Sequence, residues 1–129
     1  WSRKPKEFRD DAVNVGPLAL RQCPQFYLQL DGVIFPSLLE SFSVTPCEAL
    51  LMEKPLFASD RSFIKDVCGE YAYYFDPNNV SDIARVIANY FLGSVKRYSS
   101  TDAYDHIKGF SNSADGAEKY MHIIEKNLL

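Results

Sequence analysis

The sequence contains few histidines and cysteines, the residues that bind transition metals such as zinc. It has two histidines and three cysteines among its 129 residues. The histidines, His106 and His122, lie far apart in the sequence and belong to no cluster with metal-ligand spacing. The cysteines are odd in number and have no ligand-like spacing, so we expect packed thiols of a reducing compartment. The sequence therefore predicts no metal site and a cytoplasmic location. The cysteines are Cys23, Cys47 and Cys68.

The chain also lacks a large excess of charge and long apolar runs. Its formal net charge is −3 at pH 7, which gives no general attraction to nucleic acid or to anionic lipid. Its tyrosines are not interleaved with lysine and arginine, unlike those of surfaces that stack bases. No apolar run approaches the roughly 20 residues of a membrane-spanning helix. With 47% hydrophobic and 24% charged residues, the composition is that of an ordinary globular domain.

The stretch 32–60 has the pattern of a strand, a loop, a helix and a second strand. The short apolar run 33–35 is typical of a buried strand in a parallel sheet, and Pro36 ends it. The run 56–58 supplies the next strand. Because a helix connects the two strands, we expect a right-handed crossover and parallel pairing.

The helix between these strands has a marked beginning in the sequence. Thr45 is a good N-cap, Pro46 fits the first helical position, and Glu48 completes a capping box with Thr45. The helix should end before Pro55, because the residue that precedes a proline is pushed out of the α region. We therefore predict a helix over residues 46–52.

The remaining sequence alternates short apolar runs with amphipathic helical patterns. This alternation predicts an α/β fold, with a Rossmann-like parallel sheet flanked by helices. Ser81 is expected to cap an amphipathic helix over 81–92. The other expected elements are a weak strand at 12–15, a short helix after Pro24, a helix at 62–68, a strand at 72–75, and helices at 101–108 and 113–129.

The loop 36–44 lies where an open parallel sheet binds ligands, outside the carboxyl ends of its strands. Its backbone amides and the positive end of the helix 46–52 can receive a phosphate. Glu40 and Glu48 flank the same loop, and their carboxylates can accept hydrogen bonds from hydroxyl groups. A phosphate ester that carries many hydroxyl groups, such as a nucleotide sugar, fits this combination.

The same residues resemble a known signature. Glu40 and Glu48 are separated by seven residues, and Phe35-Pro36-Ser37 precedes them. This ordered series resembles the nucleotide-sugar signature of retaining glycosyltransferases with the GT-B fold, family 4 in particular. The resemblance extends from residue 13 to near the end of the chain. Its other matching stretches are 15–18, 26–28, 55–60 and 67–77.

The resemblance implies that residues 1–129 form the carboxy-terminal, donor-binding domain of such an enzyme, incomplete at its amino end. It assigns Glu40 to the donor sugar at the reacting centre, as the catalytic residue. It assigns Glu48 to the ribose hydroxyls, a role that can coexist with a capping box. The donor-binding residues implied in this way are Glu40, Ser41, Phe42, Ser43, Val44, Thr45 and Glu48.

The resemblance also implies the partners of the chain. These are a nucleotide-sugar donor, a glycan or other hydroxyl acceptor, and a separate acceptor-binding domain, with no cofactor and no metal. Such an enzyme belongs to polysaccharide biosynthesis, and peripheral association of the full-length enzyme with a membrane is left open.

Two residues depart from the family pattern. Ser43 and Lys54 stand where the family usually has glycine. The first departure favours an alternative, a non-catalytic interaction module that keeps the fold. Another alternative is a different GT-B enzyme, such as a nucleotide-sugar 2-epimerase or a phosphorylase.

Overall fold

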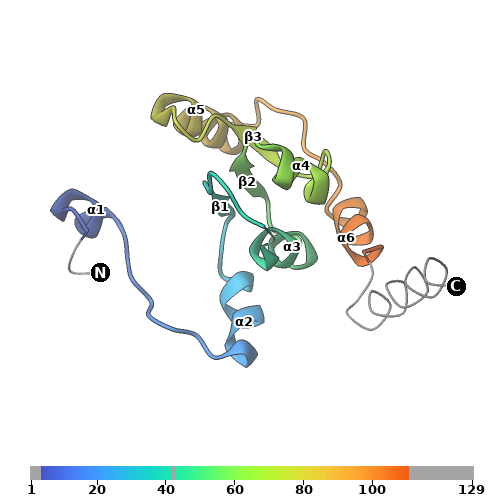
Figure 1. Cartoon of the computed structure of the whole chain (residues 1–129), viewed down its shortest axis with the longest axis horizontal. Helices are drawn as coiled ribbons and strands as arrows, with labels where there is room; N and C mark the ends of the chain where they lie inside the picture. Colours follow the sequence, from blue (N-terminus) through green and yellow to red (C-terminus); the bar gives the residue numbers. More distant parts are fainter. Residues whose placement is uncertain (1–3, 42, 111–129) are drawn as a thin grey trace, which may run out of the picture.

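Three short parallel strands form the centre of the fold (Figure 1). The structure is a computed structural model that describes residues 4–41 and 43–110, so the expected helix at 113–129 lies outside the described residues. The strands pair in the order β1-β2-β3, and both pairs are parallel. This topology confirms the predicted α/β fold. The strands are β1 (Val33–Phe35), β2 (Leu56–Ser59) and β3 (Tyr73–Phe75).

Strand β2 is buried on both of its faces. All four of its residues are at most 1% exposed. Successive side chains of a strand point to opposite faces, and Leu56 and Ala58 accordingly join one core cluster while Phe57 joins another. A central parallel strand covered on both sides needs a continuous apolar run, which explains why its sequence shows no alternation of polar and apolar residues.

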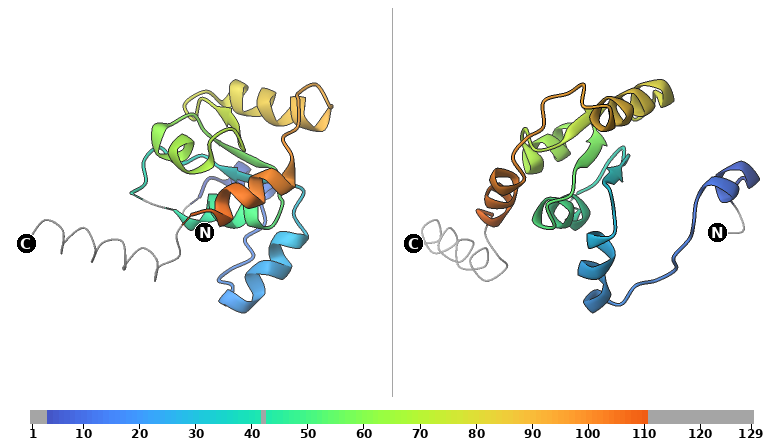
Figure 2. Two further views of the ribbon diagram at one scale, coloured as in Figure 1. Left: turned by 90° about the vertical axis from the view of Figure 1, so that its right-hand side faces the viewer. Right: turned by 180° about the vertical axis from the view of Figure 1, so that it is seen from behind.

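Helices cover both faces of the sheet. On one face, α3 (Val44–Leu51), α4 (Ser62–Cys68) and α6 (Ser100–Lys108) pack against one another and against the larger core cluster. On the other face, α5 (Val80–Phe91) packs against β3 and Phe57. Figures 1 and 2 show α3 and α5 on opposite sides of the strands. The predicted sheet with flanking helices is therefore present.

The helices α4, α5 and α6 lie within one residue of their predicted ranges. The cap of α5 differs from the prediction, because Asn79 and not Ser81 is its N-cap. The side-chain oxygen of Asn79 accepts a hydrogen bond of 3.1 Å from the backbone N–H of Asp82. Asparagine caps at least as well as serine, so the helix begins at the earlier residue.

The amino-terminal part contains short helices joined by an extended arm. In Figure 1, α1 (Lys6–Asp11) is connected to α2 (Cys23–Leu28) by an extended arm that stands apart from the sheet. A 3-10 turn, η1 (Leu20–Gln22), precedes α2. The prediction of a strand at 12–15 is wrong. Val13 is 90% exposed, and the segment pairs with no strand in the described part of the chain. Extended backbone alone does not make a strand, because a strand needs a hydrogen-bonded neighbour.

Candidate functional site

Helix α3 begins earlier than the sequence predicts. Its N-cap is Ser43, with φ −132° and ψ 133°, and its first residue is Val44. Thr45 is therefore the second helical residue and Pro46 the third, so the predicted N-cap at Thr45 and its capping box with Glu48 are wrong. Proline is tolerated there, because the first four N–H groups of a helix have no intrahelical acceptor.

The amino end of α3 has no side-chain cap. Ser43 makes no capping hydrogen bond, so the N-terminal amides of the helix lack the partner that a cap would supply. Such amides, at the positive end of a helix dipole, bind anions. They lie after the loop that leaves β1, at the carboxyl edge of the parallel sheet.

Ser43 adopts a backbone conformation that any residue can take. Its φ of −132° is extended, so the absence of glycine at this position causes no backbone strain. Next to it, Ser41 and Val44 are exposed to solvent, whereas Phe42 lies outside the described residues.

Glu40 is held within the loop that follows β1. Its Oε1 accepts a hydrogen bond of 2.9 Å from the hydroxyl of Ser37, and its side chain is half-buried. The hydrogen bond uses one carboxylate oxygen and leaves the other available. A short polar residue three positions earlier thus limits where the carboxylate can point.

Glu48 is held by a residue of another helix. Its Oε2 accepts a hydrogen bond of 2.9 Å from the hydroxyl of Tyr27, which lies on α2. Burial, together with the hydrogen bond to Glu48 and its charge, raises the pKa of the Tyr27 phenol above its ordinary value. The phenol therefore keeps its proton and acts as the donor.

A hollow of about 260 Å³ lies beside this pair, between α2 and α3. Apart from the Glu48 carboxylate and the Tyr27 hydroxyl, its lining is apolar or a thiol, and it resembles small-molecule sites in having few, well-placed polar groups. Tyr27 is not among the site residues that the sequence predicts. The lining residues are Leu20, Cys23, Pro24, Tyr27, Glu48, Leu51 and Met52.

The two glutamates therefore have different surroundings. Glu40 bonds to Ser37 within its own loop, whereas Glu48 bonds to Tyr27 across two helices. In the sequence, Glu40 lies three residues before the N-cap of α3, and Glu48 is the fifth residue of the helix. Two carboxylates in separate environments can take two different parts of one ligand.

The turn after α3 has a left-handed residue. Glu53 has φ 54°, a conformation that favours glycine. The glycine that the family pattern implies corresponds to Lys54, one residue later. Lys54 has another role: its Nζ donates a hydrogen bond of 3.0 Å to the carbonyl of Leu28, the last residue of α2. A cation at a helix C-terminus is favourable, so Lys54 helps to hold α2 against the end of α3.

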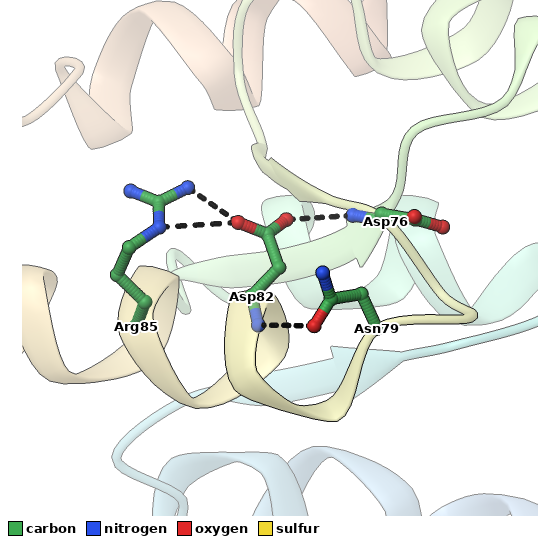
Figure 3. A network of polar contacts seen from close by, with 4 residues as sticks. All are labelled: Asp76, Asn79, Asp82 and Arg85. Carbon is green, nitrogen blue, oxygen red and sulfur yellow. Dashed lines mark hydrogen bonds and ion pairs between the residues drawn. The ribbon is translucent and has the colours of Figure 1, made fainter.

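A polar network orders the carboxyl end of β3 (Figure 3). The Oδ2 of Asp82 accepts a hydrogen bond of 2.9 Å from the backbone N–H of Asp76, and its Oδ1 accepts one of 3.1 Å from Nε of Arg85. The Asp76 N–H, followed by Arg85, holds the pKa of Asp82 below its ordinary value. The network borders a polar hollow of about 740 Å³. This hollow is lined by Asp60, Arg61, Tyr74, Phe75, Asp76, Asn78, Asp82 and Arg85.

The described residues contain no group of three or more histidine, cysteine, aspartate or glutamate side chains that could hold a metal ion. Cys68 is buried, and Cys23 and Cys47 are half-buried free thiols. Within residues 4–41 and 43–110, no helix is long and apolar enough to cross a membrane.

Comparison with known proteins identifies the family. The family model described as "Glycosyl transferases group 1" matches residues 7–104, which is more than half of the chain and includes both glutamates and all three strands. No curated protein and no solved structure matches the chain significantly. The chain belongs to the group 1 glycosyl transferases.

Proposed function

We propose that this chain is the donor-binding domain of a retaining glycosyltransferase of family 4 with the GT-B fold. It binds a nucleotide-diphospho-sugar, whose glycosyl group is transferred to an acceptor hydroxyl. One observation carries the proposal: the uncapped amino end of α3, which lies between Glu40 and Glu48 in the sequence, stands at the carboxyl edge of a parallel sheet. This is the edge at which α/β sheets bind ligands.

The diphosphate of the donor binds at the start of α3. The backbone amides of residues 43–45 supply N–H groups for it, and the helix dipole favours its negative charge. Charge grows on the diphosphate as the glycosidic bond breaks. Amides that are already oriented stabilise this charge without reorganising, so the donor site needs no metal and no cofactor.

The nucleoside binds in the apolar hollow between α2 and α3. The hollow contributes apolar side chains for the base, and its carboxylate, Glu48, accepts hydrogen bonds from the ribose hydroxyls. The volume of about 260 Å³ is close to the lower end of small-molecule sites, roughly 300 Å³. Ser41, Ser43 and Thr45 line the path between the nucleoside and the sugar.

The sugar binds beside Glu40. The hydrogen bond from Ser37 keeps one carboxylate oxygen in place, and the second oxygen faces the reacting centre. A negative charge there stabilises the positive character of an oxocarbenium-like transition state, and it orients the sugar for transfer with retention.

The acceptor, a glycan or another hydroxyl compound, binds to a second domain across the cleft. In the cell we expect the full-length enzyme to work in the cytoplasm, in polysaccharide biosynthesis. Because the 129-residue chain provides one side of the cleft, it should bind the donor without transferring the sugar.

Isothermal titration calorimetry of the 129-residue chain with UDP, GDP and ADP, and then with the corresponding nucleotide sugars, tests the proposal. We expect at least one nucleotide to bind, and Glu48→Gln to weaken that binding. The matched control is Glu53→Gln, which changes a glutamate five residues later that lies outside the hollow. A chain that binds none of these nucleotides would be an interaction module, and the proposal would be wrong.

A further inference from the structure

The hydrogen bond between Tyr27 and Glu48 joins a rigid donor to a flexible acceptor. The ring of Tyr27 packs against the larger core cluster and is half-buried. The helix that carries it is also fastened at its end, where Lys54 bonds to the carbonyl of Leu28. The hydroxyl of Tyr27 therefore has a fixed place relative to α3.

Glu48 without this bond would be free to turn. A glutamate has three side-chain torsions, and ordering them costs conformational entropy. In the folded protein, the Tyr27 hydroxyl holds Oε2 at 2.9 Å, so this ordering takes place during folding and not during ligand binding. Side chains that are ordered in advance increase affinity by lowering the cost of binding.

The bond also selects which oxygen a ligand meets. Oε2 accepts the hydrogen bond from the phenol, and Oε1 remains for another donor. Tyr27 and Glu48 both belong to the residues that line the apolar hollow between α2 and α3. A ligand with paired hydroxyl groups would therefore find one free carboxylate oxygen, Oε1, held in a defined orientation.

We propose that Tyr27 is a positioning residue for the nucleoside: its hydroxyl orients the Glu48 carboxylate so that the free oxygen accepts the ribose hydroxyl. This inference rests on the proposed function, because it assumes that the hollow receives a nucleoside. It assigns to Tyr27 a role in discriminating ribose from sugars that lack these hydroxyls, and not only a role in fastening α2 to α3.

The substitution Tyr27→Phe tests the role, because it removes the hydroxyl and keeps the ring in the core. The probes are UDP, GDP and ADP and their 2′,3′-dideoxy counterparts, titrated calorimetrically into the 129-residue chain. Loss of one net hydrogen bond corresponds to roughly five- to tenfold weaker binding of the ribonucleotide. We expect dideoxynucleotide binding to stay unchanged. The dissociation constant of the dideoxynucleotide divided by that of the ribonucleotide should therefore fall by the same factor.

A purely structural bond would give a different pattern. Its loss in Tyr27→Phe would lower the unfolding temperature and weaken the binding of both nucleotide types equally. The ratio of their dissociation constants would then stay unchanged, and that result would overturn the proposal. The control is Tyr104→Phe, which removes a hydroxyl that bonds to no other residue in the described part of the chain, on the separate helix α6. It should change neither the ratio nor the affinities.

A double-mutant cycle with Glu48→Ala shows whether Tyr27 acts through Glu48. If it does, Tyr27→Phe should weaken ribonucleotide binding about five- to tenfold in the wild type and hardly at all in the Glu48→Ala background. Equal losses in both backgrounds would contradict the inference. If the wild type binds no ribonucleotide, the proposed function fails and this inference fails with it; if the wild type binds but Tyr27→Phe keeps the wild-type ratio, only this inference fails.

A second measurement uses the wild type, in case Tyr27→Phe does not fold. Tyrosine labelled with ¹³C at Cζ reports the hydrogen bonding of the phenol in the NMR spectrum. The signal of Tyr27 should stay unchanged when the chain is saturated with the ribonucleotide, because the bond to Glu48 persists. A shift to the position of a phenol without a carboxylate partner would overturn the proposal.

Discussion

The hydroxyl of Tyr98 accepts a hydrogen bond of 3.0 Å from the backbone N–H of Leu56. Leu56 is the first residue of the central strand, and Tyr98 lies in the link between α5 and α6. A backbone N–H at the buried end of a strand needs a partner, and here a side chain 42 residues later provides it. The link after α5 is thereby tied to the amino end of the sheet, opposite the candidate donor site.

Removal of this acceptor should destabilise the chain. In Tyr98→Phe the Leu56 N–H keeps its buried position and loses its partner, so we expect the free energy of unfolding to fall by about 1–3 kcal/mol. Urea denaturation followed by circular dichroism measures the change. The matched control, Tyr104→Phe, should stay within about 0.5 kcal/mol of the wild type. Equal stability of Tyr98→Phe and the wild type would show that water satisfies the N–H.

Glycine at position 53 should stabilise the fold. Glu53 has φ 54°, and the left-handed region costs a residue with a side chain about 1–2 kcal/mol. Glycine avoids this cost but loses more backbone entropy on folding, so we expect Glu53→Gly to raise the free energy of unfolding by up to about 1 kcal/mol. Thermal unfolding measures it.

Glu53→Ala separates the backbone effect from the side chain. It also removes the hydrogen bond between Oε2 of Glu53 and the Ser100 hydroxyl, at 3.1 Å, but it keeps the strained conformation. This variant should therefore be no more stable than the wild type. If alanine stabilised the chain as much as glycine, backbone strain at this turn would not be the cause.

The two glutamates should respond differently to the same substitution. On the proposed function, Glu48→Gln is expected to weaken nucleoside diphosphate binding about five- to tenfold, because it removes the charged carboxylate that accepts hydrogen bonds from the ribose hydroxyls. Glu40→Gln should leave this affinity within about twofold and lower kcat of the full-length enzyme by at least about tenfold, because its interaction is made in the transition state. Calorimetry and initial rates measure the two effects. The reverse pattern would exchange the two assignments.

Asp82 should make stability depend on pH in the acid range. Its pKa is lowered in the folded chain, first by the backbone N–H of Asp76 and then by Arg85. A lowered pKa contributes stability that is fully present above the unfolded value, near 3.8, and is lost as the pH falls through the folded value.

The variant Asp82→Asn has no carboxylate at this position, so it lacks the stability that the charge of Asp82 contributes. The variant should be less stable than the wild type at neutral pH, and the difference should shrink below about pH 4. Urea denaturation over a series of pH values measures the difference. The control is Asp66→Asn, at an exposed position of α4. Its free energy of unfolding should follow that of the wild type across the pH series. A difference between Asp82→Asn and the wild type that is constant with pH would contradict the role of the Asp82 charge.

Much of the α/β core could be predicted from local patterns. The apolar runs 33–35 and 56–58 became parallel strands, and the helix predicted at 62–68 has the same limits in the structure. These elements are determined by properties that lie within a few residues of one another: β-branched runs, helical periodicity, and residues that stop a strand or a helix. The roles of Glu40 and Glu48 in donor binding stay predictions.

The sequence by itself thus determined the order and type of the core elements and the spacing of the two glutamates. Only the tertiary structure decided that 12–15 forms no ladder in the described residues, that α3 begins after Ser43, and that Glu48 bonds to Tyr27. The physical reason is the range of the interactions. A strand needs a neighbour, and a carboxylate needs a donor. Here the donor of Glu48 lies 21 residues away in the sequence, so only folding brings it within hydrogen-bonding distance.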